Sequence, residues 1–280
     1  MSRVADQHAR RVVYGLSYVF LIGVGISMLA PLLWMLVTSI KSPDADVMSL
    51  AKWLPDKPHW GNYRKVMVET NFARALFNSF LVTISVTVGQ VFTSSLAAYA
   101  FARLEFRGRD KLFLGYLATM MIPAAVTTIP LFILMRHLRW VNTYWALLVP
   151  GMFSAYGTFM LRQFFMTIPK ELEDAAIIDG CGPLGVYWNV ILPLSKPALA
   201  TLSILTFMGS WRSFMWPLII THTRDMFTLP VALAQFQEMY GVQWTLMMAG
   251  SVIMIIPMLI VFIFGQRYFV EGIQLGAIKG

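Results

Sequence analysis

Residues 12–39 read VVYGLSYVFLIGVGISMLAPLLWMLVTS, a stretch without a charged side chain that starts directly after Arg11 and ends just before Lys41. An α-helix rises about 1.5 Å per residue, so about 20 apolar residues cross the roughly 30 Å hydrocarbon core of a bilayer. The stretch is therefore long enough to span a membrane. It is too long for the apolar part of a secretory signal peptide, and no small-residue cleavage site follows it, so we expect a retained helix.

The same pattern recurs along the chain, of which 58% is hydrophobic and only 13% is charged. Soluble domains carry about 25% charged residues. Backbone polar groups in lipid must pair within their own segment, which favours helices. The sequence therefore predicts an all-α fold, a polytopic membrane protein with six transmembrane helices. The expected spans are residues 12–39, 76–102, 112–135, 141–164, 198–221 (interrupted by Arg212) and 246–268.

The distribution of basic residues gives an expected orientation. Arg3, Arg10 and Arg11 lie in the tail 1–11, and this density favours a cytoplasmic amino terminus. Six spans would then return the carboxyl terminus to the cytoplasm. The preference of basic residues for the cytoplasmic side is obeyed only in part, because the loop 41–74, expected outside, is also rich in basic residues. We expect a single transmembrane domain over residues 1–280, with the loop 166–196 in the cytoplasm.

Several classes of site are disfavoured by the sequence. The single cysteine, Cys181, excludes an internal disulfide, and no cluster of His, Cys and Asp has metal-ligand spacing. Residues 180–185 match the dinucleotide pattern G-x-G-x-x-G, but no strand precedes them and Pro183 lies within them. A phosphate-binding P-loop motif is missing too. The net charge of +8 is typical of lipid-headgroup contacts, and we expect no nucleic acid partner.

One hydrophilic loop interrupts the apolar pattern, and residues 167–197 read TIPKELEDAAIIDGCGPLGVYWNVILPLSKP. Acidic residues open it, and Leu172, Ala175 and Ala176 follow at the i, i+3, i+4 spacing of one helix face. Gly180 and Gly182 allow a sharp bend. Pro183 suits the start of a second short helix. We expect a helix–turn–helix on the inner membrane face that docks a soluble partner; the alternative is an interfacial helix without a partner.

The spacing within this loop resembles that of permease subunits of ATP-binding-cassette importers. Their signature is Glu-Ala-Ala, three residues, Gly, nine residues, Ile, one residue and Leu-Pro. Here Asp174–Ala175–Ala176 precede Gly180, and Val190 and Leu192–Pro193 follow at the same spacing. Asp replaces Glu, and Val replaces Ile. The resemblance implies that these residues couple to an ATPase subunit: Glu171, Glu173, Asp174, Ala175, Ala176, Asp179, Gly180, Pro183, Leu192 and Pro193.

The resemblance also implies an assembly in a prokaryotic inner membrane. A second, different permease subunit completes the pathway, two ATP-binding subunits dock below it, and an extracytoplasmic solute-binding protein docks above it. ATP and Mg²⁺ belong to the ATPase subunits, so this chain is expected to bind no cofactor and to be no enzyme. Solute moves by alternating access, driven by closure of the ATPase subunits.

Further stretches are similar to those of carbohydrate permeases of the maltose type. They include Pro31–Met35, Ala98–Arg103, Leu161–Phe165, Thr228–Val231 and the ending Gln266–Gly272 with Gly276–Gly280. That resemblance implies import of sugars or oligosaccharides, and glycerol phosphates are the alternative substrate class. The solute itself is not encoded in a recognisable motif.

The fifth span departs from the family pattern, since Arg212 stands where Asn is usual in the run 211–217, WRSFMWP. A charge within hydrocarbon costs roughly 2.5–3.5 kcal/mol on insertion scales, so it should face a partner or water. We expect the substrate pathway to include Trp211, Arg212, Phe214 and Trp216. A lining arginine favours an anionic or strongly hydroxylated solute. The alternatives are an ion pair or snorkelling for Arg212 and ordinary packing or lipid contact for the aromatic residues.

Two other classes of protein compete with a permease. A membrane-embedded sugar transferase needs paired carboxylates or a metal at the membrane surface, yet the nearest acids, Glu171 to Asp179, lie in the signature itself. A channel needs no ATPase-docking loop. Copurification with an ATP-binding subunit separates the three classes.

Overall fold

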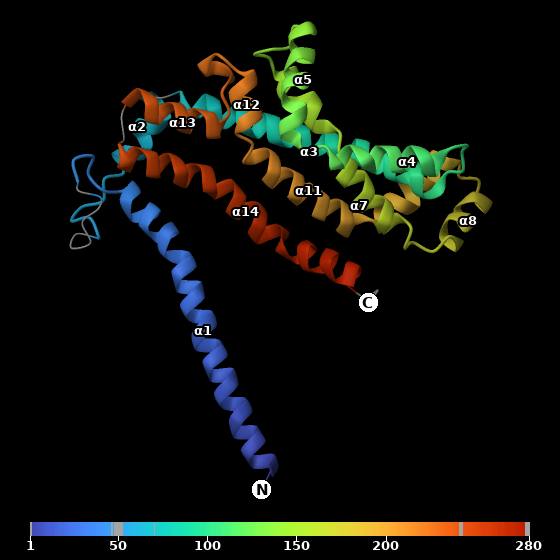
Figure 1. The fold of residues 1–280 in the computed structure, drawn as a ribbon, viewed down its shortest axis with the longest axis horizontal. Helices are drawn as coiled ribbons and strands as arrows, with labels where there is room; N and C mark the ends of the chain where they lie inside the picture. The colour runs from blue at the N-terminus through green and yellow to red at the C-terminus, as the bar shows by residue number, and fades with distance from the viewer. Residues whose placement is uncertain (1, 46, 48–52, 70, 241–242, 278–280) are drawn as a thin grey trace. The chain divides into compact units, whose positions relative to one another are not determined.

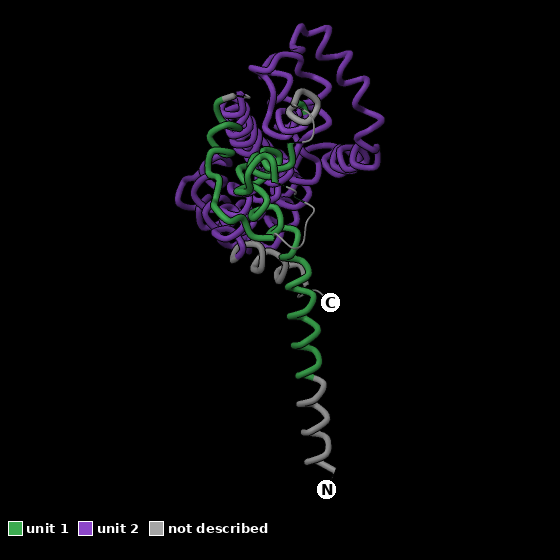
Figure 2. Tube along the Cα trace, turned by 90° about the vertical axis from the view of Figure 1, so that its left-hand side faces the viewer, with its two compact units in different colours: residues 1–70, 235–253 green, residues 71–234, 254–280 purple. Residues whose placement is uncertain are grey.

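The computed structural model describes residues 2–45, 47, 53–69, 71–240 and 243–277, without the side chains of 2–13, 69, 236–240 and 267–277. The described residues form helices and no strand, which confirms the predicted all-α class (Figure 1). Contacts divide the chain into two compact units, residues 1–70 with 235–253, and residues 71–234 with 254–280 (Figure 2). The expected tail 1–11 and the ending 266–280 lie largely outside the described side chains.

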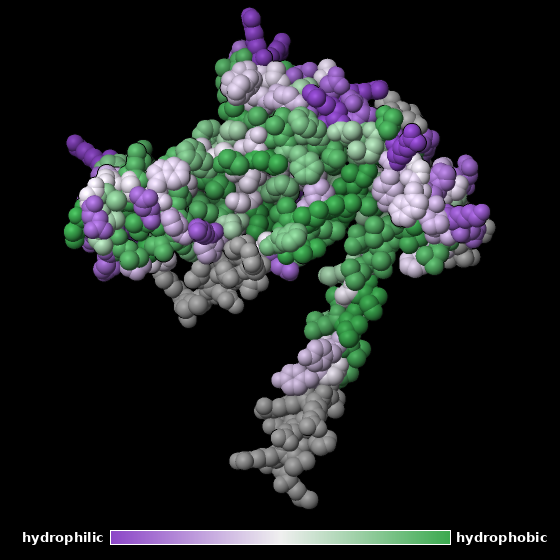
Figure 3. Space-filling view, turned by 180° about the vertical axis from the view of Figure 1, so that it is seen from behind, coloured by the Kyte–Doolittle hydropathy of each residue, from purple (hydrophilic) through white to green (hydrophobic). Residues whose placement is uncertain are grey.

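The first unit contains α1 (Ser2–Ser39) and α2 (Gly61–Glu69), together with the start of α14 (Trp244–Ala277). The end of α1 is held by Asn62, whose amide donates to the carbonyls of Ser39 and Lys41 at 2.9 and 2.8 Å. These bonds satisfy carbonyl groups that a helix end leaves without intrahelical partners. The described side chains of α1 from Tyr14 to Leu36 are mostly exposed and apolar, as Figure 3 shows. Such a surface suits contact with lipid or with another membrane chain.

The second unit is built on α3 (Phe72–Arg103), which packs along α7 (Ala155–Phe165) and α11 (Lys196–Trp211) (Figure 1). Small and hydroxyl-bearing residues let membrane helices approach closely. Gly157 of α7 is such a position, because a Cβ added there would lie 2.7 Å from Ser94 Oγ and 3.3 Å from Leu202.

The other elements of the second unit are short. They are α4 (Arg109–Ala118), η2 (Thr119–Met121), α5 (Ala124–His137), α6 (Tyr144–Leu148), η3 (Val149–Met152), α8 (Glu171–Ile178), α9 (Pro183–Val186), η4 (Tyr187–Ile191), α10 (Leu192–Leu194), α12 (Met215–Ile220) and η5 (Arg224–Met226). The helix α13 (Leu229–Tyr240) is divided between the two units.

The six predicted stretches are all helical, but three of them are interrupted. A bend of 100° at Ile122 and Pro123 separates α4–η2 from α5. The stretch 141–164 is divided by η3, which contains Pro150, into α6 and α7. The stretch 198–221 is broken after Trp211, and Pro217 lies in the first turn of α12. Proline lacks the backbone donor that continues a helix, and this explains why the breaks lie near prolines.

Three helices are long and apolar enough to cross a membrane when only the described residues are considered: α1 from Tyr14, α3, and α14 as far as Gln266. Counting each strongly bent pair as one span raises the number to five. The second such pair bends by 77° between the segment Pro183–Leu194 and α11. The predicted stretch 141–164 does not enter this count, because η3 divides it into pieces that are too short.

We predict that Gly157→Ala destabilises the chain although alanine favours helix. The added methyl group would overlap Ser94, and overpacking typically costs about 1–3 kcal/mol. Gly115→Ala in α4 is the matched control, since a Cβ there meets no atom within 4 Å. The measurement is thermal melting of the purified chain in detergent. Equal melting temperatures for the two variants would contradict close packing of α3, α7 and α11.

Candidate coupling site

The signature glycine Gly180 ends α8 in a left-handed conformation, with φ of 88°. Two backbone bonds close the helix, from Gly180 N to Ile177 O at 3.0 Å and from Cys181 N to Ala176 O at 2.9 Å. This pair of bonds is a Schellman motif, which requires a residue that tolerates positive φ. The spacing from Asp174 to Gly180 therefore corresponds to the stretch of chain from the first turn of α8 to the glycine that ends the helix. As expected, α8 begins at Glu171 and a second short helix begins at Pro183.

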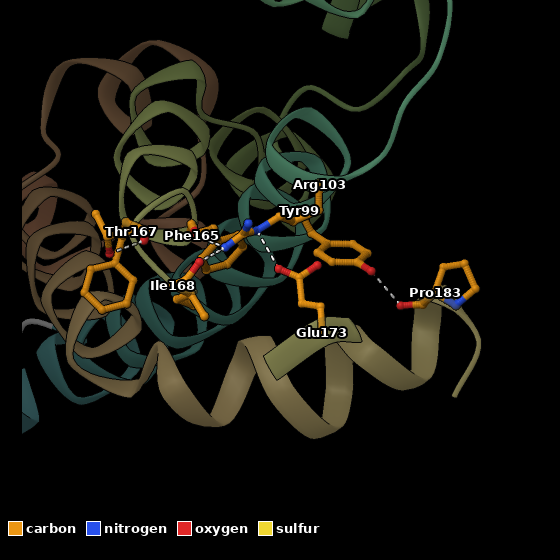
Figure 4. A network of polar contacts seen from close by, with 8 residues as sticks. Tyr99, Arg103, Phe165, Thr167, Ile168, Glu173 and Pro183 are labelled. Atoms are coloured by element: carbon orange, nitrogen blue, oxygen red, sulfur yellow. Dashed lines mark hydrogen bonds and ion pairs between the residues drawn. The ribbon is translucent and has the colours of Figure 1, made fainter. Parts of the chain in front are cut away.

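Three residues of α3 hold the loop from one side. Ser95, Tyr99 and Arg103 follow one another at four-residue intervals, so they lie on one face of the helix. The Tyr99 hydroxyl donates to the carbonyl of Pro183 at 2.8 Å. The hydroxyls of Ser95 and Tyr187 lie 2.7 Å apart and share a hydrogen bond. One face of α3 thus contacts the loop at successive points along its length, and Figure 4 shows the contacts of Tyr99 and Arg103.

Arg103 makes the third and most extensive contact. Its guanidinium donates to the carbonyls of Phe165 and Ile168 at the end of α7. Its Nε lies 2.9 Å from the Glu173 carboxylate, and Figure 4 shows the two side chains pointing toward each other. The Nε–H is not aligned with that oxygen, so this contact is an ion pair and not a hydrogen bond. A cation at the carboxyl end of α7 also complements the helix dipole.

The two adjacent acids of α8 differ in their surroundings. The Glu173 side chain is only 13% exposed, whereas Asp174 is exposed to solvent. Burial raises the pKa of the Glu173 carboxyl, and the Arg103 guanidinium beside it offsets this only in part. The structure therefore turns Glu173 inward, toward α3. It leaves Asp174 available to a partner.

The outer side of the loop combines acidic and apolar residues. Ile177, Ile178, Leu184 and Trp188 are more than half exposed, and Ile178 is 86% exposed. Among the predicted coupling residues, Glu171, Asp174, Ala175, Asp179, Gly180, Pro183 and Pro193 are exposed, whereas Ala176 and Leu192 are half-buried against the core beneath. Exposed apolar side chains rimmed by polar groups are typical of a protein interface.

The core beneath the loop explains its fixed position. Leu161 and Phe165 of α7 and Tyr187 and Ile191 of η4 are fully buried together. The backbone from Tyr187 to Ile191 forms a π-helical turn directly before Leu192 and Pro193. Leu192 N bonds Tyr187 O five residues back, a pattern found as single turns that are often functional.

The predicted pathway residues lie in three different settings. Trp211 is buried between Phe80 and Phe207, and its indole donates to the carbonyl of Met254 at 2.9 Å. Arg212 is exposed at the end of α11, where its Nε donates to the carbonyl of Met208 at 3.1 Å.

Phe214 is also exposed, at 37%, whereas Trp216 lines a cavity of the second unit. A role of these four residues in the solute pathway stays a prediction. Within the described residues, His, Cys, Asp and Glu form no group that could hold a metal ion.

Residues 90–274 match the family described as the binding-protein-dependent transport system inner membrane component. The chain belongs to this family. It is a permease subunit of an ABC importer, a translocation component rather than an enzyme. Its place in the inner membrane follows from the same match, and the predicted fold class is confirmed.

Curated relatives differ in the solutes that their names give. The arabinooligosaccharides transport system permease protein AraQ of Halalkalibacterium halodurans is 43% identical over 203 residues, covering 72% of this chain and 73% of the relative. The sn-glycerol-3-phosphate transport system permease protein UgpE of Yersinia enterocolitica is 34% identical over 259 residues, covering 89% and 92%.

Two solved structures share the fold. A chain from the crystal structure of a bacterial ABC transporter involved in the import of the acidic polysaccharide alginate has a TM-score of 0.84 and 26% identity, covering 92% of this chain and 96% of that one. A second chain comes from the alginate transporter in complex with an alginate pentasaccharide-bound periplasmic protein. Its TM-score is 0.65 at 13% identity, covering 90% and 93%, which supports the fold alone.

We predict that Glu173 makes the stability of the chain fall as pH rises. Its pKa is higher in the folded chain than the ordinary value of 4.5, so the folded state binds more protons. The contribution is complete below that ordinary value and is lost as pH rises through the raised pKa. Thermal melting between about pH 4 and 7 should show a slope that Glu173→Gln lacks. Parallel profiles for wild type and variant would contradict the raised pKa.

Proposed function

We propose that this chain is the permease subunit of an ATP-driven sugar or oligosaccharide importer, coupled to a separate ATPase subunit through the loop 166–196. The observation that supports this best is the geometry of α8. The helix presents Asp174, Ile177 and Ile178 to solvent and is fixed from behind by Arg103. An outward surface on an inwardly anchored helix suits a docking element.

The anchoring makes α8 and α3 one mechanical body. A flexible connection would make few contacts, but here α3 contacts α8 through Arg103, α9 through Tyr99 and η4 through Ser95. Three separate contacts would have to break before the loop could leave α3, so the connection is not readily broken during a cycle. Movement imposed on α8 by an ATPase subunit is therefore passed to the long membrane helix α3 and to α7.

The remaining partners follow from this assignment. A second permease subunit completes the pathway, two ATPase subunits bind ATP and Mg²⁺, and a solute-binding protein delivers the solute from outside. The loop 166–196 then lies in the cytoplasm, with both termini on the same side. Channels and sugar transferases need no such docking surface.

A sugar is the solute class we favour, and the arabinooligosaccharide relative supports it with the highest identity among the relatives named above. Glycerol phosphate is the second candidate, because the glycerol-phosphate permease matches over most of both chains.

We expect Asp174→Trp and Gly180→Leu to uncouple transport without preventing pairing of the two permeases. The tryptophan obstructs the exposed face of α8, and the leucine strains a residue with φ of 88°. ATP-driven uptake in proteoliposomes should fall at least about tenfold, equivalent to 1.4 kcal/mol of coupling. The ATPase subunit should also copurify more weakly.

Asp110→Trp is the matched control. Asp110 is an exposed acid in the first turn of α4, and its ion pair with Arg109 is a surface pair worth little. Normal uptake by both Asp174→Trp and Gly180→Leu would exclude docking through α8.

A further inference from the structure

A partly open cavity of about 280 Å³ lies within the second unit, bordered by α3, α6, η3, α11 and α12. Its polar lining includes Ser79, Thr83, Gln90, Thr206, Ser210 and Ser213. The Trp216 ring and aliphatic side chains complete the wall. The volume approaches the lower end of ligand pockets, roughly 300–1,000 Å³.

The cavity lies along α3, away from the coupling loop. Gln90 and Ser79 precede Arg103 by 13 and 24 residues on α3, which places them about 20 and 36 Å along the helix from the coupling loop. Two helix interruptions border the cavity, η3 through Gly151 and the break after α11 through Ser213. Irregular backbone at membrane depth is tolerated where it is buried in protein or lines a water-filled cavity.

Hydroxyl and amide side chains lie around the cavity. Thr228 lines it and is 4% exposed, and its hydroxyl is among the buried polar atoms of the described residues that have no partner. Gln90 Nε2 donates to Thr206 Oγ1 at 2.9 Å, so these two side chains are fixed beside each other.

Charged side chains are missing from the described lining of the cavity. Arg212, two residues after Ser210, is exposed, and its Nε bonds the carbonyl of Met208. An anion in this cavity would lose its hydration without gaining a counter-charge, which is strongly unfavourable. A neutral sugar would gain hydrogen bonds from the hydroxyl groups and an aromatic face from Trp216.

We infer that this cavity is a solute subsite of the present chain, selective for a neutral sugar unit over phosphorylated or acidic solutes. The inference rests on the proposed function. It chooses between sugars and glycerol phosphate, the two classes of solute that the names of the relatives contain. It also assigns solute contact to α3 and to the α11–α12 break.

Gly209 provides the sharpest test, because it lines the cavity and a Cβ added there meets no atom within 4 Å. Gly209→Leu therefore adds a bulky side chain at the cavity lining, starting from a Cβ that meets no neighbour, and leucine favours helix. Gly115→Leu in α4 is the matched control, in open space away from the cavity. Thr83→Val is a second variant, which removes a hydroxyl at nearly constant shape.

The assay is ATP-driven uptake by the tagged chain, purified with its partner subunits and reconstituted with the solute-binding protein. The probes are arabinotriose, maltotriose, an alginate trisaccharide and sn-glycerol 3-phosphate. We expect a neutral trisaccharide to enter fastest. Gly209→Leu should lower that rate at least about tenfold, and Gly115→Leu should keep it within about twofold. Thr83→Val should raise the solute concentration for half-maximal uptake about fivefold, with the complex intact.

Three outcomes separate the claims. Fastest uptake of alginate trisaccharide or glycerol phosphate overturns the selectivity and leaves the importer role standing. Unchanged sugar uptake by both Gly209→Leu and Thr83→Val overturns the subsite. A complex that drives uptake of none of the four probes with ATP contradicts the proposed function itself, and the inference with it.

Discussion

The guanidinium of Arg103 joins the end of α3 to two consecutive segments that lie far from it in the sequence, the end of α7 and the first turn of α8. Its side chain is only 4% exposed, so its charge requires partners. Two backbone carbonyls and the Glu173 carboxylate provide them. The position of α8 depends on this arrangement, because α8 has no fully buried residue of its own. Burial of Arg103 is thus the constraint that turns a short amphipathic helix into a fixed platform.

A second constraint comes from the backbone of the membrane helices. Helix breaks expose N–H and C=O groups that lipid cannot satisfy. In this chain the interruption at η3 and the interruption after α11 border the same cavity. Of the polar side chains of α3 that line it, Ser79 and Thr83 lie in the half of the helix farther from the coupling loop, and Gln90 lies in the nearer half. The continuous helix α3 (Figure 1) therefore runs from the coupling loop past the residues that line the cavity.

Much of the architecture could be predicted from the sequence. Charge-free runs located the apolar helices, because a bilayer tolerates few charges, and the signature spacing located α8 and its terminal glycine. The helix interruptions were harder to predict, since prolines such as Pro31 and Pro257 lie inside unbroken helices whereas Pro123 and Pro150 accompany breaks. Neighbouring packing decides between these outcomes, and composition does not reveal it.

The inward role of Glu173 could not be predicted either. It adjoins Asp174 in an acidic run, and only the fold places it beside Arg103, 70 residues earlier in the chain. A signal did exist on α3, because Ser95, Tyr99 and Arg103 form a polar stripe at four-residue spacing near the end of that helix. Arg212, the one charged residue of the predicted span 198–221, lies at the end of α11 and is not among the residues that line the cavity.

The central claim, that α8 moves as one body with α3, can be measured directly. Spin labels at Ile178→Cys on α8 and Val88→Cys on α3, both exposed positions, would report their separation in the assembled importer with Cys181→Ser. The account predicts that the distribution of distances between these two labels is the same in the nucleotide-free and the ATP-bound complex. A second pair of labels, on α8 and on the ATPase subunit, would show that the complex passes through its cycle. A shift in the α8–α3 distance on ATP binding would contradict it.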